Sequence, residues 1–317
     1  YLGVPFRKIC MKSLTVATRG GSLAIAQSEH VIATLQEIHP GLEIRIKEIT
    51  TTGDKDRRTA LWTLKETGFF TSQVEDALTA HEADFAVHSF KDLPTAQRDG
   101  LTIGAVFDRN FVEDCLVSAS PVESIDQLPA DAKIGTSSIR RAAQLKHLRA
   151  DLVPTPIRGN VHTRLRKLET GEFDAILLAR AGLQRLGLAE KISFIFDPAV
   201  FIPAPAQGAL GIQTRADDDE TNEIIAAIDD ANARITTAAE RKILTTMKCG
   251  CHAPVGAYAE IAGGDIQIRA FISEVDGKNF ISRELTGPTE DAENLAEKIA
   301  QEILDAGGKE ILESLEK

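Results

Sequence analysis

The sequence predicts two α/β units followed by a small α+β domain. Apolar runs of strand length alternate with helical patterns over residues 14–202, as is typical of α/β sheets. Residues 202–215 then mix Pro, Gly and apolar side chains, which predicts a hinge followed by one strand. From residue 223 the pattern changes to one long helix and three alternating segments joined by glycine turns.

Length and composition exclude several classes of protein. The 317 residues are 43% hydrophobic and 26% charged, which is ordinary for a globular chain. A net charge of -11 argues against general binding to nucleic acids or anionic membranes, because phosphate binding needs a broad basic surface. No apolar run approaches the roughly 18 residues of a membrane span. Four scattered cysteines predict a reducing, cytoplasmic compartment rather than a disulfide framework.

The N-terminal stretch YLGVPFRKIC is set apart from the fold. It is too short and too poorly apolar for a signal peptide, and Met11 is a candidate natural start. Residues 1–10 are therefore interpreted as an N-terminal extension.

The first unit combines strands, a glycine turn and two helices. Ser22 follows the glycine turn and is placed to cap the first helix. Ser72 and Glu75 predict a capping box for the second helix. The expected strands span residues 14–19, 42–46, 85–87 and 101–106, and the expected helices span residues 22–38 and 72–81.

Within this unit, the stretch DFAVHSFKDLP at residues 84–94 is the first candidate site. A buried strand leads there into a polar loop, and loops at strand ends carry ligand sites in α/β sheets. The loop holds Lys91 and Asp92, whereas residues 133–167 are crowded with Lys and Arg and contain a single acid, Asp151. This contrast predicts a site for acidic ligands. The alternative is that Lys91 and Asp92 form a solvated charged turn.

The second unit repeats the pattern of strand, polar turn and helix. Hydroxyl side chains at residues 136–138 precede a helix that begins with Arg140 and Arg141, and a helix N-terminus with two guanidinium groups predicts an anion site. The expected strands span residues 114–118, 133–135, 152–157 and 173–178, and the expected helices span residues 139–149, from 160 to the stop at Gly171, and 181–186.

Six arginines in both units fall at loops or helix starts. At such places a guanidinium group can hold a carboxylate through two parallel hydrogen bonds, which lysine cannot do. The alternative is that each forms a surface ion pair that contributes about 0–1 kcal/mol. The six are Arg19, Arg140, Arg141, Arg158, Arg164 and Arg185.

The third part adds a second chemical stretch, KCGCHAP at residues 248–254. A long helix is expected over residues 223–247, strands over 255–261, 266–272 and 280–285, and a closing helix over 291–304. KCGCHAP resembles half a zinc site, but no second pair of ligands lies at finger spacing. An exposed thiol there can also serve covalent attachment. Taken alone, the stretch favours inert cysteines. His88, His147, His162 and His252 show no spacing typical of a metal site or a triad, and most of them are interpreted as structural.

Eight motifs occur in an order that resembles the porphobilinogen deaminase, or hydroxymethylbilane synthase, family. The resemblance covers nearly all of the chain from Leu14 onward. The motifs are ATRGGSLAIAQ, TTGDKD, FAVHSFKDLPT, GTSSIRRAAQL, IRGNVHTRLRKL, AGLQRLGL, PAPAQGALGI and CGCHAPVGAYAE.

The resemblance implies both the architecture and the reaction. It implies two domains similar to periplasmic binding proteins, joined by a hinge, and a C-terminal α+β domain with a three-stranded antiparallel sheet. It also implies a monomeric transferase that joins four porphobilinogen molecules on a cysteine-linked dipyrromethane primer, loses four ammonia molecules and releases hydroxymethylbilane by hydrolysis for tetrapyrrole biosynthesis. The implied domain limits are residues 11–107 with 208–222, 113–202 and 223–317.

The family's functional residues are carried over position by position. The resemblance implies that Asp92 is the catalytic carboxylate and that Cys251 carries the cofactor, with no metal. It implies contacts to cofactor or substrate by Arg19, Ser89, Lys91, Thr136, Ser137, Ser138, Arg140, Arg141, Arg158, Gly159, Arg164, Arg185 and Gln207.

Three departures from the family pattern leave contacts open. The stretch TLKETGFF has Thr63 and Thr67 where the family has lysines, which yields the hypothesis that Lys65 substitutes for them. Ser22 lies one place later than the family's serine, so its cofactor contact stays open. Cys249 replaces a glycine and can compete with Cys251, although the HAPVG that follows favours Cys251.

Two further classes compete with this interpretation, and the first of them also suits a two-lobed chain with a basic cleft. A solute-binding protein or a regulator's effector domain needs neither a modified cysteine nor a catalytic carboxylate. A zinc protein that uses KCGCH would hold a metal ion. Intact mass separates the three, because the enzyme alone retains two pyrrole units after denaturation.

Overall fold

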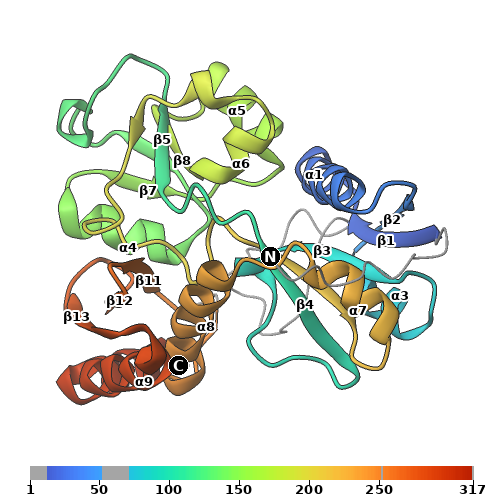
Figure 1. The fold of residues 1–317 in the computed structure, drawn as a ribbon. Coiled ribbons are helices and arrows are strands. Elements are labelled where there is room, and N and C mark those ends of the chain that lie inside the picture. The colour runs from blue at the N-terminus through green and yellow to red at the C-terminus, as the bar shows by residue number, and fades with distance from the viewer. Residues whose placement is uncertain (1–12, 52–70, 251–252, 316–317) are drawn as a thin grey trace.

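The computed structural model describes residues 13–51, 71–250 and 253–315, which form three sheets (Figure 1). Two sheets have five strands each and belong to α/β units, and the third has three antiparallel strands. The predicted fold class, two α/β units followed by a small α+β domain, is confirmed. Among the helices of these residues, none combines the length and hydropathy that crossing a bilayer requires.

The first sheet has the strand order β2-β1-β3-β10-β4. The strands β2, β1 and β3 are parallel, whereas β10 enters from far along the sequence and runs antiparallel to β3 and β4. The core between this sheet and its helices contains Leu14, Val31, Phe85 and Ile212, all fully buried. The elements are β1 Ser13–Arg19, α1 Ser22–Ile38, β2 Glu43–Ile49, α3 Ser72–Thr79, β3 Phe85–Ser89, β4 Leu101–Phe107, β10 Leu210–Arg215 and α7 Asp219–Ala226.

The second sheet has the order β7-β6-β8-β5-β9 and the same arrangement, with three parallel strands next to an antiparallel one. Its core includes Leu116, Ile134, Leu145 and Leu177. The elements are β5 Asp114–Ser118, β6 Lys133–Gly135, α4 Ile139–Leu148, β7 Val153–Thr155, α5 Val161–Glu169, β8 Ala175–Ala179, α6 Arg180–Arg185 and β9 Phe194–Ile195.

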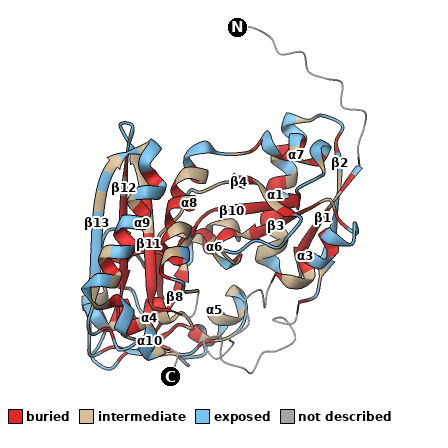
Figure 2. Cartoon of the chain, turned by 90° about the horizontal axis from the view of Figure 1, so that it is seen from below, coloured by how far each residue is buried: buried red, intermediate tan, exposed pale blue. Residues whose placement is uncertain are grey.

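The third sheet, β11-β12-β13, packs against α8 and α9. Figure 2 shows that β11 and β12 are buried along much of their length, while the outer strand β13 is largely exposed. The helix α8 also contacts β4, so it lies between the third sheet and the first (Figure 1). The elements are α8 Ala231–Thr246, β11 Val255–Ala262, β12 Asp265–Ile272, β13 Ile281–Pro288, α9 Ala292–Ile303 and α10 Lys309–Leu315.

The predicted caps of the first unit are wrong at two helices. Gly21, with φ 123°, occupies the N-cap position of α1, so Ser22 is the first helical residue and does not cap the helix. Thr71 occupies the N-cap position of α3, and no side chain caps that helix. The Glu75 carboxylate instead accepts a hydrogen bond from Gln213 Nε2 at 3.0 Å in the core, so the capping box does not form.

The C-terminal helices also differ from the prediction. The single helix expected over residues 223–247 is two helices, because the Asp230 side chain accepts a hydrogen bond from Ala233 N at 3.0 Å and starts α8 afresh. The first of the two, α7, packs on β4 and β10. A further helix, α10, follows α9 after a kink at Gly307, where φ is 113°. The sequence predicts only the first of these two helices.

Candidate active site

Asp92 ends a short 3-10 helix, Phe90–Asp92, that continues directly from β3. Phe90 is 5% exposed and donates its backbone N–H to Ala209 O at 3.0 Å. Its ring lies so close to Gly211 of β10 that a Cβ atom there would be 2.6 Å from Phe90 Cδ2. The turn is therefore packed firmly on the sheet, while the Asp92 side chain is exposed to solvent.

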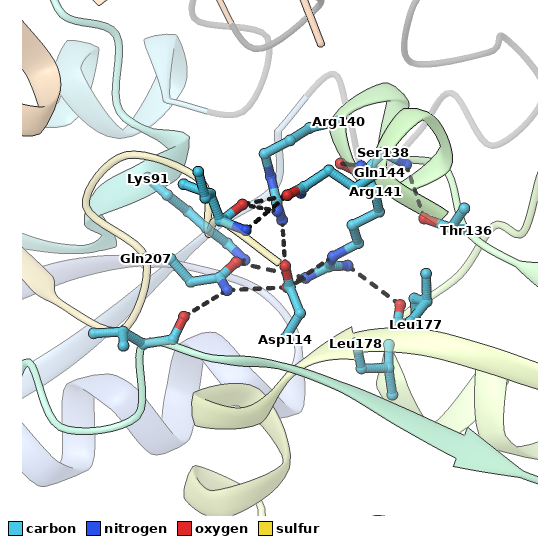
Figure 3. Close-up of polar contacts among 12 residues, drawn as sticks. Lys91, Asp114, Thr136, Ser138, Arg140, Arg141, Gln144, Leu177, Leu178 and Gln207 are labelled. Carbon is cyan, nitrogen blue, oxygen red and sulfur yellow. Dashed lines mark hydrogen bonds and ion pairs between the residues drawn. The ribbon is translucent and has the colours of Figure 1, made fainter. Parts of the chain in front are cut away.

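A buried carboxylate that the sequence analysis did not single out, Asp114, lies at the start of β5 (Figure 3). It forms ion pairs with Arg140 Nη2 at 2.7 Å and with Arg141 Nη2 at 2.7 Å, and it accepts a hydrogen bond from Gln207 Nε2 at 3.0 Å. Burial raises the pKa of Asp114, but the two guanidinium groups and Gln207 outweigh burial and lower it to about 2. The carboxylate is therefore ionised at any working pH.

Arg140 and Arg141 are consequently buried members of an ion cluster rather than surface ion pairs. Their exposed fractions are 5% and 7%. Arg140 also donates to Ile202 O at 2.6 Å, and Arg141 donates to Leu177 O at 3.2 Å. One carboxylate between two guanidinium groups leaves one positive charge uncompensated within this trio, so this end of the site remains cationic.

Lys91 joins the turn that carries Asp92 to this cluster. Its ammonium group donates to Gln207 Oε1 at 3.1 Å, and Gln207 in turn donates to Asp114 (Figure 3). Burial, together with the positive charge of Arg141, lowers the pKa of Lys91 to about 8, although Asp92 and Asp114 oppose the shift. Gln207 therefore links Lys91 of the first unit to Asp114 of the second.

The turn before α5 contributes a third cationic element. Gly159 has φ 111°, and a Cβ atom there would lie 2.5 Å from Thr163 Cγ2, so this turn requires glycine. Arg164 Nε donates to Gly159 O at 2.8 Å. Burial and the charges of Arg141 and Arg158 lower the pKa of Arg164 to about 10, and the charge of Asp92 opposes them. Arg164 therefore lies within electrostatic reach of Arg141 and Arg158 and of the Asp92 carboxylate.

Three of the four hydroxyl residues that were expected at the site form hydrogen bonds to the backbone. Ser138 is the N-cap of α4 and accepts a hydrogen bond from Arg141 N. Ser137 donates to Ile157 O at 2.5 Å, and Thr136 Oγ1 accepts from Ser138 N at 3.2 Å. Ser89 bonds to the Gln27 side chain at 2.9 Å. Residues 136–138 therefore hold the loop before α4 and the first turn of that helix, whereas Ser89 links β3 to α1.

Arg185 contacts both chain segments that connect the two units, which we call the first crossing (residues 108–113) and the second crossing (residues 203–209). It donates to Asp108 Oδ2 at 3.0 Å and to the backbone oxygens Asp108 O at 2.8 Å and Gly208 O at 2.5 Å. These contacts join both chain crossings to α6.

Ser22, at the start of α1, has its hydroxyl 3.4 Å from Nδ1 of His162 in α5. Ser22 of the first unit therefore contacts the second unit.

His88 is a structural residue, in line with the interpretation of most of the histidines. Its Nε2 lies 3.1 Å from Gln213 Oε1 in the core of the first sheet. Burial lowers the pKa of His88 to about 4, against the bond to Gln213, and the charge of Arg19 adds to the lowering. The ring is therefore neutral at physiological pH.

Several predicted residues lie outside the described residues, namely Thr63, Lys65, Thr67 and Cys251. Cys249 is described and half-buried. It lines a cavity of about 540 Å³ between the end of α8 and α10, together with Met247, Lys248 and Leu312.

Comparison with known proteins gives one consistent result. The family model "Porphobilinogen deaminase, dipyromethane cofactor binding domain" matches residues 14–223, and "Porphobilinogen deaminase, C-terminal domain" matches residues 234–305. The porphobilinogen deaminase of Maridesulfovibrio salexigens is 42% identical over 303 residues, covering 96% of this chain and 98% of the relative. That of Desulforudis audaxviator is 44% identical over 301 residues, covering 95% and 97%.

A solved structure, the methionine binding protein MetQ, overlaps with 72% of this chain and 94% of its own at 11% identity and a TM-score of 0.42. At that TM-score the overlap adds nothing to the assignment of the fold, which follows from the sheets themselves.

Proposed function

The chain belongs to the porphobilinogen deaminase family, and from this premise we propose how its own residues carry out the family's reaction. The enzyme joins four porphobilinogen molecules head to tail on a covalently held dipyrromethane cofactor, loses four ammonia molecules and releases hydroxymethylbilane. The proposal assigns the chemistry to Asp92 and the binding of the acidic side arms to the cationic groups around it. The observation that carries it is the exposed Asp92 carboxylate on a packed turn beside Lys91 and Arg164.

The residues fit a cofactor and a substrate that bear carboxylates. Porphobilinogen carries an acetate and a propionate, and each added unit brings two more negative charges. Arg141, Arg158, Arg164 and Lys91 supply positive charge from both α/β units. Charge-assisted hydrogen bonds to such groups are worth about 1.5–3 kcal/mol each when shielded from water. When bound through Cys251, the dipyrromethane supplies the free pyrrole α-carbon to which the first substrate is joined.

Asp92 is assigned three tasks during each addition. It assists protonation of the leaving amine, because a carboxyl group can relay a proton to it. Once ammonia has left, it stabilises the positive charge that develops on the pyrrole nitrogen. After the new carbon–carbon bond has formed, it accepts the proton from the pyrrole α-carbon. All three tasks need a carboxylate of fixed position, which the packed Phe90–Asp92 turn supports.

Intact-mass spectrometry of the denatured chain tests the proposal. We expect the purified protein to carry two pyrrole units, to gain further units stepwise with porphobilinogen, and to release ammonia in step. The Cys251→Ser variant serves as the control and should carry no adduct, whereas Cys249→Ser should carry it in full. An unmodified wild-type chain that leaves porphobilinogen unchanged under reducing conditions would overturn the proposal.

Lys91 should make substrate binding dependent on pH. Its pKa of about 8 means that the ammonium group loses its charge as the pH rises through 8. We expect KM for porphobilinogen to rise above about pH 8, because a neutral amine no longer attracts the substrate carboxylates. In the Lys91→Arg variant the charge persists, so the rise in KM should move to higher pH. Steady-state kinetics over about three pH units centred on that pKa measure the rise in KM in both proteins. A rise in KM at the same pH in both proteins would assign it to another group.

We also propose the domain limits and the working state of the enzyme. The limit expected at residue 223 falls inside α7, which packs on the first sheet, so the first domain is taken to extend to the turn before α8. The second domain is taken as residues 113–202, and the third starts with α8. The enzyme is proposed to act as a cytoplasmic monomer. The buried thiol of Cys115, whose pKa burial raises to about 12, is in keeping with a chain that does not depend on disulfides.

A further inference from the structure

The turn that carries Asp92 is held from behind by Arg241, a residue of α8 in the third domain. Arg241 Nη1 donates to Leu93 O at 2.8 Å and lies 3.5 Å from Phe90 O, and Nη2 donates to Pro94 O at 2.6 Å. The guanidinium carbon also lies 4.5 Å from the centroid of the Phe90 ring. These contacts reach both sides of Asp92 along the chain.

This set of contacts restricts the turn more than a single bond would. A guanidinium group is planar and donates in fixed directions, so two carbonyl oxygens bound at once fix the orientation of the peptides that follow Asp92. A cation–π contact between Arg241 and the ring of Phe90 also fixes Phe90, which lies two places before Asp92. Lysine at position 241 would keep the charge but could not donate in the same fixed directions to both carbonyl oxygens.

The helix that carries Arg241 is itself anchored to the other domains. The neighbouring carboxylate of Glu240, fully buried, accepts hydrogen bonds from Ala206 N at 2.7 Å and from Ala259 N at 2.7 Å. It also pairs with Arg109. Ala206 belongs to the second crossing between the α/β units, and Ala259 belongs to β11. Arg241 therefore projects from a fixed point of α8.

The same helix leads into the stretch that bears the cofactor cysteine. α8 ends at Thr246, five positions before Cys251 in the sequence. The same helix therefore contacts the turn of Asp92 through Arg241 and leads, along the sequence, toward Cys251. Coupling chemistry depends steeply on such geometry, since a misplacement of about 1 Å can cost about 100-fold in rate.

We propose that Arg241 is a positioning residue that fixes the Asp92 carboxylate relative to the cofactor-bearing domain. The inference rests on the proposed catalytic role of Asp92. Arg241 does not need to touch the substrate, because it acts through the carbonyls of residues 90, 93 and 94. Its loss should therefore lower kcat while leaving the affinity for porphobilinogen nearly intact.

Three variants of α8 separate this role from general stability. We expect Arg241→Met to lower kcat about 10- to 100-fold with KM changed less than about threefold, when rates are normalised to the fraction that carries the cofactor by intact mass. Arg241→Lys should recover part of kcat. The matched control is Lys242→Met, which removes only the partly exposed ion pair with Glu297 at 3.1 Å and should keep wild-type kcat. If Arg241→Met does not fold, a wild-type kcat in Arg241→Lys overturns the proposal and a reduced one supports it.

A double-mutant cycle shows whether Arg241 acts through Asp92. In the Asp92→Asn background, the further change Arg241→Met should alter the single-turnover rate by less than about twofold, because the group that Arg241 positions is already gone. Multiplicative losses would show that the two act independently and would overturn the inference. If Asp92→Asn alone keeps wild-type turnover, the proposed function of Asp92 fails instead. The two failures are therefore distinguishable.

Discussion

The Asp92→Asn variant should fold, carry two pyrrole units and form product at least about 1,000-fold more slowly than the wild type. An amide of the same shape neither transfers the proton to the leaving amine nor stabilises the positive charge that follows, and each of these effects is typically worth about 100-fold or more. Stability should change little, because the Asp92 side chain is exposed and the turn is held by Phe90. Ammonia release and tetrapyrrole formation measure the rate.

The matched control for this substitution is Asp99→Asn, which removes another exposed carboxylate seven positions along the chain. It should leave kcat within about twofold of wild type, as is usual for a surface change away from a site. A kcat for Asp92→Asn within tenfold of wild type would overturn the catalytic assignment. A variant that folds and lacks the adduct would instead place Asp92 in assembly of the cofactor.

Regular elements were predictable because their signals are local. The strand Asp114–Ser118 and the strand Lys133–Gly135 have the predicted bounds, since short apolar runs bounded by polar residues leave little choice. The division between α7 and α8 was missed, because helix-forming residues run through the turn and only the cap at Asp230 marks the break. Ser22 and Ser72 were misassigned for the converse reason, since the sequence shows a capping residue but not the φ and ψ angles around it.

The candidate site was predictable in its residue types but not in its pairings. The arginine tract and Asp92 stand out in the sequence, whereas the partner of Arg140 and Arg141 lies 26 and 27 positions earlier, at Asp114. One signal pointed to it, an acid that opens the apolar run CLV. The contacts of Arg185 with Asp108 and Gly208 likewise depend on where two chain crossings meet. No spacing in the sequence gives that meeting point.

The Asp114→Asn variant should lose more stability than any surface substitution in this chain. Removing the charge leaves Arg140 and Arg141 buried without a counter-ion, and breaking a buried pair in this way costs about 3–5 kcal/mol. The free energy of unfolding, measured with urea at pH 7, gives the loss. The matched control is Asp151→Asn, which breaks a partly exposed pair with Arg149 at 2.6 Å and should leave the unfolding midpoint close to wild type. Equal midpoints for the two variants would contradict the prediction.

The acid dependence of stability provides a second test of Asp114. Its pKa is about 2 in the folded chain against 3.8 as the ordinary value, so the unfolded state binds more protons between these two values. The stabilisation by this group is therefore fully present above about pH 4 and is lost as the pH falls through about 2. In Asp114→Asn the contribution of this group to the acid transition should be absent, because the amide does not titrate, whereas Asp151, whose pKa the bond to Arg149 also lowers to about 2, keeps its own contribution. An unchanged transition over that interval would show that other carboxylates cause it.

The same substitution should also alter the site through Lys91. The charge of Asp114 raises the pKa of Lys91, opposing burial and Arg141, so its removal should lower that pKa further below 8. The rise in KM expected above pH 8 should then begin at lower pH in Asp114→Asn, provided that the variant is assayed where it remains folded. A structural role alone would reduce the active fraction at every pH and leave this dependence in place. The shift therefore reports on the electrostatic link from a carboxylate buried in the second sheet to the turn that carries Asp92 in the first.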